Sequence, residues 1–273
     1  MDLLKDIEEY DLTFIDLETT GLDVITGDAI CEIGALKVKN RKIIEEFHSL
    51  VNPGKPIPKE AYQVHKISDE DLKNAPYFND IAAKLIAFLA NSVVCAYNVS
   101  FDLGFINYQL KKVEYSPIDL PAIDILAMAR DILQLPRYDL VTTAKHFDIS
   151  IQGVLHRALN DAAMAYQVFL KLMDILKEKR INKLGQILSL YGFSNEIFKV
   201  AEDKKTALLK DAIQKATILK MKFFSRDNAI EEEEIIPLRI LQENKYCYLL
   251  YQRPKAETLQ IRLNRILEVN AFK

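Results

Sequence analysis

FIDLETTGL, residues 14–22, joins a short apolar run to two acids and a glycine turn. In a strand, alternate side chains point the same way, so Asp16 and Glu18 share one face and the apolar residues beside them share the other. Two neighbouring carboxylates repel each other, and a bound cation is the usual reason that a protein tolerates such a pair. An isolated pair can also lie on a solvated edge strand, so a cation site requires partner acids further along the chain.

The composition predicts a globular protein without a membrane segment. The 273 residues are enough for two domains, and 49% hydrophobic and 27% charged residues are ordinary values for soluble proteins. The first residues, MDLLKD, lack the apolar core of a secretory signal, and apolar runs such as 85–90 are far shorter than the roughly 20 residues of a membrane helix. The three cysteines are scattered, which favours buried thiols in a reducing cytoplasm over disulfides or a zinc site. We therefore expect a cytoplasmic location.

Charge is distributed unevenly along the chain. Residues 201–273 hold 14 Lys and Arg against 11 Asp and Glu, whereas the first 200 residues are acidic, within a net charge of −3. An acidic region is a poor candidate for nucleic-acid binding on charge alone. Bound divalent cations can reverse this locally because they are often the largest charges in a site.

The apolar pattern of the first 178 residues predicts an α/β fold, a mixed sheet with helices on both faces. Three strand-like runs come first, and a polar turn at Asn40-Arg41 joins the second to the third. A Pro-rich loop at 52–58 then leaves the sheet, and Ser68 has the pattern of a helix N-cap. The expected strands are 12–17, 29–39, 42–51 and 92–97, and the expected helices are 79–89, 98–112, 124–133, 140–147 and 158–177.

Asp102 is the first candidate partner for the acids of the opening strand. It lies in the first turn of the helix that Asn98 is expected to cap, where the helix dipole stabilises an anion. This turn also follows the carboxyl end of a strand, where α/β sheets commonly place ligands. Taken alone, Asp102 can equally be a capping acid on a surface helix.

His156 and Asp161 form the second candidate group, at the start of the long helix. Small residues follow Asp161, which would let the helix pack closely on the sheet. Five positions correspond to about 140° around a helix, so the two side chains would not share a face if both were helical. We therefore expect His156 on the preceding loop, leaning over the site. Alone, it would be read as a surface or structural histidine.

Together, DLETTG at 16–21, N-x-x-F-D at 98–102 and H-x-A-x-x-D-A at 156–162 resemble the three motifs of the DnaQ-like, or DEDDh, 3′–5′ exonucleases. The resemblance covers roughly residues 9–178 and implies a ribonuclease H-like mixed sheet. Two positions depart from the family pattern, with Tyr97 where a histidine is common and Lys66 where a glycine is common. Neither position is a metal ligand in the family.

The resemblance implies a chemical mechanism and a set of site residues. Four acids would hold two Mg²⁺ or Mn²⁺ ions about 4 Å apart, and His156 would take the proton from the attacking water as general base. The product would be a nucleoside 5′-monophosphate. The metal ligands implied are Asp16, Glu18, Asp102 and Asp161, and the residues implied to contact the terminal nucleotide are Thr20, Leu22, Asn98 and Phe101.

The periodicity changes after the long helix. Residues 182–190 and 202–219 are interpreted as helices, and strand-like runs follow at 219–224, 235–241, 245–252 and 258–266. The acidic run at 231–234 is interpreted as a solvated turn. We expect an exonuclease domain at 1–178, a helical linker at 179–204 and a small β-rich domain at 205–273.

The β-rich segment resembles a WYL domain over about 205–270, through IPL at 236–238, YCYLL at 246–250 and IRLNRI at 261–266. Cys247 stands in place of the tryptophan of that family, and Asn264 where aspartate is common. The resemblance implies an SH3-like barrel that binds nucleic acid or a nucleotide-like ligand through Tyr248, Arg262 and Arg265. The alternative is that the arginines make structural ion pairs.

Three functions remain open at this point. The leading hypothesis is a metal-dependent 3′–5′ exonuclease, with DNA favoured, that acts on a free 3′ end and whose C-terminal module grips the strand or senses a ligand. An RNA-trimming enzyme would use the same residues, and a regulator would bind nucleic acid without turnover. A proofreading role would require a polymerase or repair partner in trans, and the oligomeric state is open.

Overall fold

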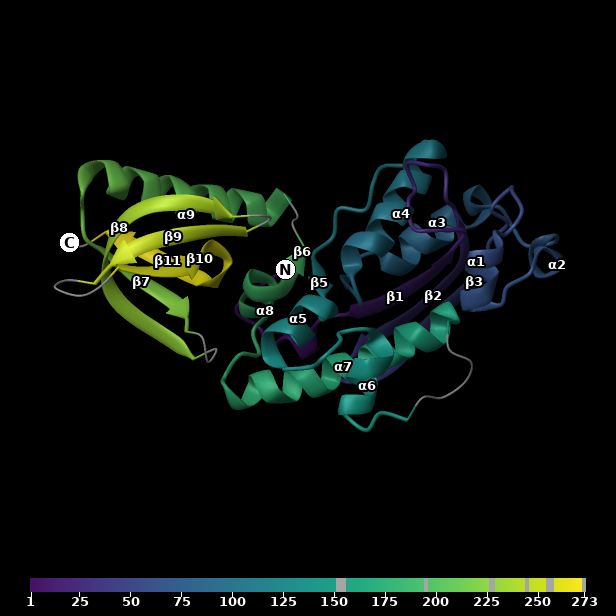
Figure 1. Cartoon of the computed structure of the whole chain (residues 1–273), viewed down its shortest axis with the longest axis horizontal. Helices are drawn as coiled ribbons and strands as arrows, with labels where there is room; N and C mark the ends of the chain where they lie inside the picture. The colour runs from purple at the N-terminus through teal and green to yellow at the C-terminus, as the bar shows by residue number, and fades with distance from the viewer. Residues whose placement is uncertain (151–155, 194–195, 226–228, 244–245, 254–257, 272–273) are drawn as a thin grey trace.

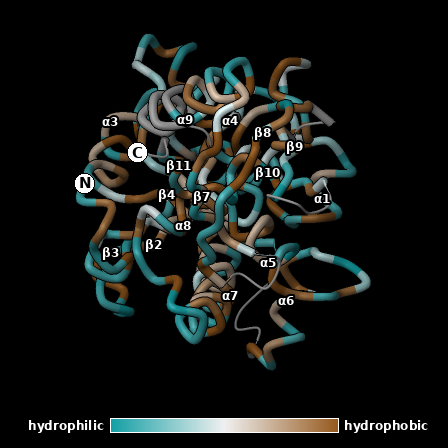
Figure 2. The backbone as a smooth tube through the Cα atoms, turned by 90° about the vertical axis from the view of Figure 1, so that its left-hand side faces the viewer, coloured by the Kyte–Doolittle hydropathy of each residue, from teal (hydrophilic) through white to brown (hydrophobic). Residues whose placement is uncertain are grey.

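The computed structural model describes residues 1–150, 156–193, 196–225, 229–243, 246–253 and 258–271. Two sheets organise the chain, a six-stranded one in the first part and a five-stranded one in the last part (Figure 1). Hydrophobic segments gather toward the middle of the molecule and hydrophilic ones dominate the outer turns (Figure 2). Within the described residues, no helix combines the length and the apolar character needed to cross a membrane.

The first sheet is mixed and has the order β3-β2-β1-β4-β5-β6. β1, β2 and β3 form the expected antiparallel meander, and β4 and β5 then add in parallel to β1 and to each other. Its strands are β1 (Leu12–Thr19), β2 (Ile30–Lys39), β3 (Lys42–Leu50), β4 (Val93–Ala96), β5 (Ala122–Asp124) and β6 (Gly192–Phe193). The predicted mixed α/β fold is confirmed, although the short strands β5 and β6 were not predicted from sequence.

Helices cover both faces of this sheet, as the alternation along β1 requires. Phe14 packs under α7 on one face, and Ile15 packs with α3 and α4 on the other. The helices are α1 (Lys59–His65), α2 (Asp69–Leu72), α3 (Phe78–Leu89), α4 (Val99–Lys112), α5 (Ile125–Ile132), α6 (Leu140–His146) and α7 (Ala158–Glu178), preceded by the 3₁₀ turn η1 (Ile7–Glu9). Ser68 caps α2 as expected, in a reciprocal pair with Asp71.

The segment expected as a linker packs as part of the first unit. α8 (Leu184–Tyr191) buries Ile187 and Tyr191 in the same core as α7, and β6 pairs with β5. The next helix, α9 (Glu196–Lys215), instead packs on the second sheet through Leu209 and Ala212. The division into domains at 178 and 204 stays a prediction. In the structure, α8 shares the core of the exonuclease-like unit.

The second sheet is antiparallel, in the order β10-β9-β8-β7-β11. Among the described residues its outer strands β10 and β11 do not pair, so the expected closed SH3-like barrel is not confirmed. The strands are β7 (Leu219–Phe224), β8 (Ile230–Glu243), β9 (Tyr246–Gln252), β10 (Thr258–Arg262) and β11 (Ile266–Ala271). The 3₁₀ turn η2 (Leu263–Arg265) breaks the single strand expected at 258–266.

The prediction of a solvated turn at 231–234 is wrong. These glutamates belong to β8 and pair with β7, and Glu232 makes an ion pair of 2.8 Å with Lys220. Cross-strand pairs of opposite charge stabilise an exposed sheet surface, which is how a run of acids can continue a strand.

Gly34 of β2 marks the closest approach between the sheet and α7. A Cβ at this position would lie 2.1 Å from the backbone nitrogen of Leu159 and 2.3 Å from the carbonyl carbon of Ala158. Both atoms belong to the first turn of α7, so the absence of a side chain at Gly34 sets how near that turn lies to the sheet.

We expect Gly34→Ala to destabilise the protein by about 1–3 kcal/mol, because the backbone of α7 would have to move away from β2. Urea unfolding followed by circular dichroism measures this. Gly104→Ala is the matched control. Gly104 is exposed in the middle of α4, and a Cβ there would meet no atom within 4 Å. This substitution should stabilise the protein by about 0.5–1 kcal/mol. Equal unfolding midpoints for the two variants would contradict the packing argument.

Candidate active site

The two acids of β1 lie on the side of the sheet that α7 covers. Glu18 is buried and Asp16 is half-buried. Their alternation with Ile15 and Leu17, which belong to the opposite core, follows directly from the strand geometry. The sequence prediction that the two carboxylates share a face agrees with this placement.

Asp102 reaches the same place from α4. Asn98, at the N-cap position, has a left-handed backbone (φ 82°) and its side chain makes no capping hydrogen bond, so the expected cap is made by backbone geometry alone. The carboxylate of Asp102 is buried, and the backbone of Leu17, between the two acids of β1, favours its ionised form. Burial, and then the charge of Asp124, raise the pKa of Asp102 to about 8.

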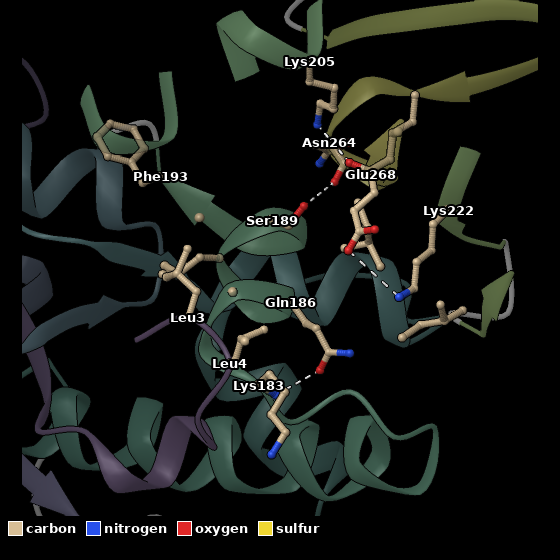
Figure 3. Close-up of a pocket in the computed structure, with 16 residues that line it drawn as sticks. Leu3, Leu4, Lys183, Gln186, Ser189, Phe193, Lys205, Lys222, Asn264 and Glu268 are labelled. Atoms are coloured by element: carbon tan, nitrogen blue, oxygen red, sulfur yellow. Dashed lines mark hydrogen bonds and ion pairs between the residues drawn. The ribbon is translucent and has the colours of Figure 1, made fainter. Parts of the chain in front are cut away.

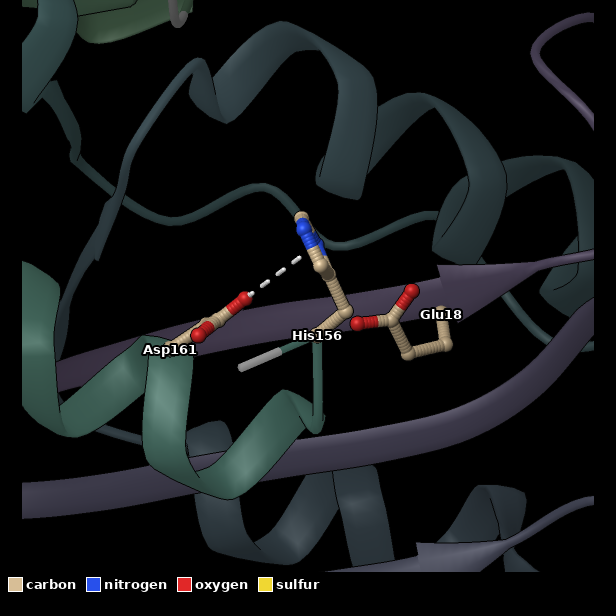
Figure 4. Close-up of side chains that lie close together, drawn as sticks. All are labelled: Glu18, His156 and Asp161. Atoms are coloured by element: carbon tan, nitrogen blue, oxygen red, sulfur yellow. Dashed lines mark ion pairs between the residues drawn. The ribbon is translucent and has the colours of Figure 1, made fainter. Parts of the chain in front are cut away.

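Asp161 and His156 complete the cluster from the start of α7. His156 precedes the helix, as expected, and its Nδ1 lies 4.0 Å from Oδ2 of Asp161 (Figure 4). One ligand atom from each of Glu18, His156 and Asp161 lies within 4.8 Å of the others. Among the described residues no donor reaches Oδ1 of Asp161, which is buried.

Burial, reinforced by repulsion between neighbouring carboxylates, dominates the electrostatics of the cluster. Burial raises the pKa of Asp16, and the charges of Asp102, Asp161 and Glu18 raise it further. Burial, followed by Asp161, raises the pKa of Glu18 to about 8. Either protons or a cation must neutralise such a group, and the unpartnered oxygen of Asp161 offers a ligand position. The donor set is carboxylate oxygen, which suits Mg²⁺ or Mn²⁺, so these residues fit divalent ions.

Glu32 of β2 is a site residue that the sequence analysis missed. It is fully buried and stands directly opposite Glu18 in the sheet. Burial opposes its ionisation, but hydrogen bonds from Arg157, His48 and the N–H of Ala158 hold its pKa below the usual range. The sequence did contain a signal, a single acid inside the apolar run of β2. A buried acid is expected only where an ion pair or a metal neutralises it.

The four expected nucleotide-contacting residues differ in their surroundings. Leu22 is 85% exposed, so its side chain is free to pack on a base. Asn98 is exposed, and the ring of Phe101 lies tilted against that of Phe105, with 4.8 Å between the ring centroids. The hydroxyl of Thr20 is buried, donates to Asp28 and accepts from the N–H of Ala29, which gives it a structural role in the turn after β1.

A sequence model of the family described as Exonuclease matches residues 13–169, more than half of the chain. The chain belongs to the exonuclease family. The matched region contains all five members of the acid and histidine cluster. The predicted DnaQ-like exonuclease domain, and with it the class of nuclease hydrolase, is confirmed.

Two curated relatives differ in how much of their own length matches this chain. The epsilon subunit of DNA polymerase III from Rickettsia typhi is 36% identical over 209 residues, which are 74% of this chain and 91% of that protein. The PolC-type DNA polymerase III of Thermotoga petrophila is 33% identical over 201 residues, which are 69% of this chain and only 15% of that protein.

Solved structures agree on the fold. The nuclease domain of 3′hExo, described as a DEDDh family member bound to rAMP, superimposes with a TM-score of 0.54 at 16% identity. The match covers 62% of this exonuclease and 94% of that domain. It confirms the ribonuclease H-like arrangement of the first sheet and its helices.

The residues expected to bind a ligand in the C-terminal part have different environments. Tyr248 and Arg262 are paired across β9 and β10, so their side chains share one face of the second sheet. Arg265 instead makes an ion pair of 3.2 Å with Asp131 of α5 and donates to the carbonyl oxygen of Phe224. Arg265 therefore makes an ion pair with the first unit, whereas the alternative from the sequence placed such pairs inside the barrel.

A separate cavity of about 460 Å³ lies where the exonuclease unit meets the second sheet (Figure 3). Leu3, Ser189 and Phe193 line one side, and Lys205 and Lys222 line the other. None of the clustered acids borders it. The cavity is therefore distinct from the acid site.

Metal-free protein should lose stability as pH rises from about 5 to about 9, as measured by Tm in EDTA. The raised pKa values mean that the folded state binds more protons than the unfolded state, so this stabilisation is complete below the ordinary acid pKa and is lost through about pH 8. Saturating Mg²⁺ should flatten the profile.

Glu18→Gln removes one of these groups and should reduce the slope. Glu46→Gln, a change of an exposed acid on β3, should keep it. A flat Tm profile for the unaltered protein in EDTA would contradict the electrostatic description.

Proposed function

We propose that this exonuclease is a metal-dependent enzyme of the DEDDh type that hydrolyses nucleic acid from the 3′ end. The observation that carries the proposal is the convergence of four carboxylates from β1, α4 and α7, with His156 4.0 Å from Asp161. Two divalent ions would bind to Asp16, Glu18, Asp102 and Asp161. When bound, they would supply the charge that stabilises the attacking and leaving oxygens of a phosphodiester.

The residues of the chain would divide the remaining work. The imidazole of His156 accepts a proton from the attacking water, a role that suits histidine because its side chain exchanges protons in the neutral range. Asp161 lies beside His156 and orients the ring. The new P–O bond forms to the water oxygen, the bond to the 3′ oxygen breaks, and a nucleoside 5′-monophosphate leaves. Leu22, which is exposed beside the site, packs on the terminal base.

DNA is the favoured substrate because relatives that match over most of their own length are subunits of a DNA polymerase. By the same analogy, a polymerase or repair enzyme would be the partner in trans. RNA remains the second candidate, since the proposed chemistry acts on the phosphodiester, which DNA and RNA share. A comparison of matched DNA and RNA oligonucleotides decides between them.

The C-terminal part is proposed as a WYL-like module that grips the strand. Tyr248 offers a stacking face and Arg262 a phosphate contact on the same side of the second sheet. The basic balance of residues 201–273 supports this assignment.

Asp16→Asn and Asp161→Asn should abolish nucleotide release while the circular dichroism spectrum is kept, because each removes a ligand charge from the cluster. His156→Ala should lower kcat by about 10²–10⁴-fold if it is the general base. Stepwise shortening of a 5′-labelled oligonucleotide with Mg²⁺ or Mn²⁺ measures both effects. His146→Ala is the matched control on exposed α6 and should retain full activity. Full activity in Asp16→Asn would overturn the proposed function.

Combining Tyr248→Ala with Arg262→Ala should weaken binding of single-stranded DNA by about 1–3 kcal/mol per base that stacks, and should lower the salt dependence. The full-length Asp16→Asn background prevents cleavage during fluorescence-anisotropy titrations. Lys210→Ala, an exposed cation on α9, which packs on the opposite face of the sheet, controls for the loss of one positive charge. Equal affinities in the double variant and the control would contradict the proposal that Tyr248 and Arg262 bind the strand.

A further inference from the structure

The first turn of α7 receives its cap from the sheet. Arg157 occupies the N-cap position, but its side chain makes no capping hydrogen bond. The first N–H groups of any helix lack partners within the helix. Here Oε2 of Glu32, on β2, accepts the backbone N–H of Ala158 at 3.0 Å. A residue 126 positions earlier in the chain therefore supplies what a local N-cap side chain normally would.

The same carboxylate also holds Arg157. The Nη2 of Arg157 donates to Oε1 of Glu32 at 2.7 Å, and its Nε lies 3.1 Å and 3.2 Å from the two oxygens. His48 of β3 lies on the other side, with Nε2 2.7 Å from Oε1. Glu32 is fully buried, and hydrogen bonds between charged groups are stronger away from water. These contacts tie the start of α7 to β2 and β3.

This segment carries two members of the active site. His156 directly precedes Arg157 and adopts a left-handed backbone, φ 58°. A residue other than glycine keeps such a conformation only where the surroundings hold it. Asp161 lies in the first turn of α7, and both side chains come within 4.8 Å of Glu18. Glu18 in turn is the cross-strand partner of Glu32.

Stability alone does not account for a charged group in this position. A buried ion pair is often matched or exceeded in stability by apolar residues of similar volume, and the neighbours of Glu32 on β2 are all apolar and buried. The ion pair does fix the orientation of the start of α7, because the planar guanidinium of Arg157 and the N–H of Ala158 bond to different oxygens of the same carboxylate.

We propose that Glu32 is a positioning residue of the exonuclease reaction. Through Arg157 and the N–H of Ala158, it holds His156 and Asp161 at their working distance from Glu18. The inference rests on the proposed function, which assigns the proton acceptor and the ion ligands to these residues. Glu32 itself contacts neither the substrate nor the ions.

The test compares carboxylates that anchor the two ends of one helix. Glu32→Gln keeps the shape of the side chain but removes its charge at the start of α7. Glu8→Gln is the matched control, because Glu8 makes an ion pair of 2.6 Å with Lys177 in the last turn of α7. The full chain is used, kcat and KM are measured on a single-stranded oligonucleotide, and calorimetry measures Mn²⁺ affinity without substrate.

Glu32→Gln is expected to lower both kcat and Mn²⁺ affinity by about 10–100-fold, as loss of a hydrogen-bond partner behind a ligand commonly does, with KM nearly unchanged. Glu8→Gln should leave both values within about twofold, although each variant removes a carboxylate charge that anchors α7. Arg157→Gln should resemble Glu32→Gln, and the double variant should lose little more, because both residues act through one contact.

Three outcomes would overturn the inference. They are wild-type Mn²⁺ affinity in Glu32→Gln, equal losses in Glu8→Gln, and additive losses on combining Glu32→Gln with Arg157→Gln. If the unaltered chain released no nucleotide, the proposed function would fail, whereas the Mn²⁺ affinities would still test the role of Glu32. Circular dichroism confirms that each variant is folded at the assay temperature.

Discussion

Repulsion among buried carboxylates is the constraint on which the first unit depends. Asp16, Glu18, Asp102 and Asp161 come from three elements, and burial raises the pKa of each, with the charge of at least one nearby carboxylate adding to the shift. The carboxylates cannot hold one another in place. The elements that carry them must therefore be anchored by other contacts, and the structure shows these as backbone and ion-pair contacts around the cluster.

The anchors of α7 are the clearest case. At its start, Gly34 allows the helix backbone to approach β2, and Glu32 accepts the N–H of Ala158. At its end, Glu8 pairs with Lys177. Asp102 of α4 is also influenced by another element, because the backbone of Leu17 on β1 favours its ionised form.

The C-terminal part is joined to the exonuclease unit by polar contacts as well as by packing. Arg265 pairs with Asp131, and the hydroxyl of Ser189 donates to the carbonyl oxygen of Asn264. Phe224 of β7 is buried in the core that also contains α7 and α8. One arginine expected to bind a ligand therefore links the two sheets, while Tyr248 and Arg262 remain the candidates for binding.

The sequence by itself determined most elements of the nuclease unit and predicted the acids of its site. Periodicity of apolar residues is local, so the strand of Asp16 and the helix of Asp161 could be read from it, and three ordered motifs then implied the family. Tertiary structure decided what local patterns cannot encode. The partners of Glu32 lie 16 to 126 positions away, the glutamates at 231–234 pair as a strand with β7, and α8 joined the first core through long-range packing. Such contacts depend on which surfaces meet after folding.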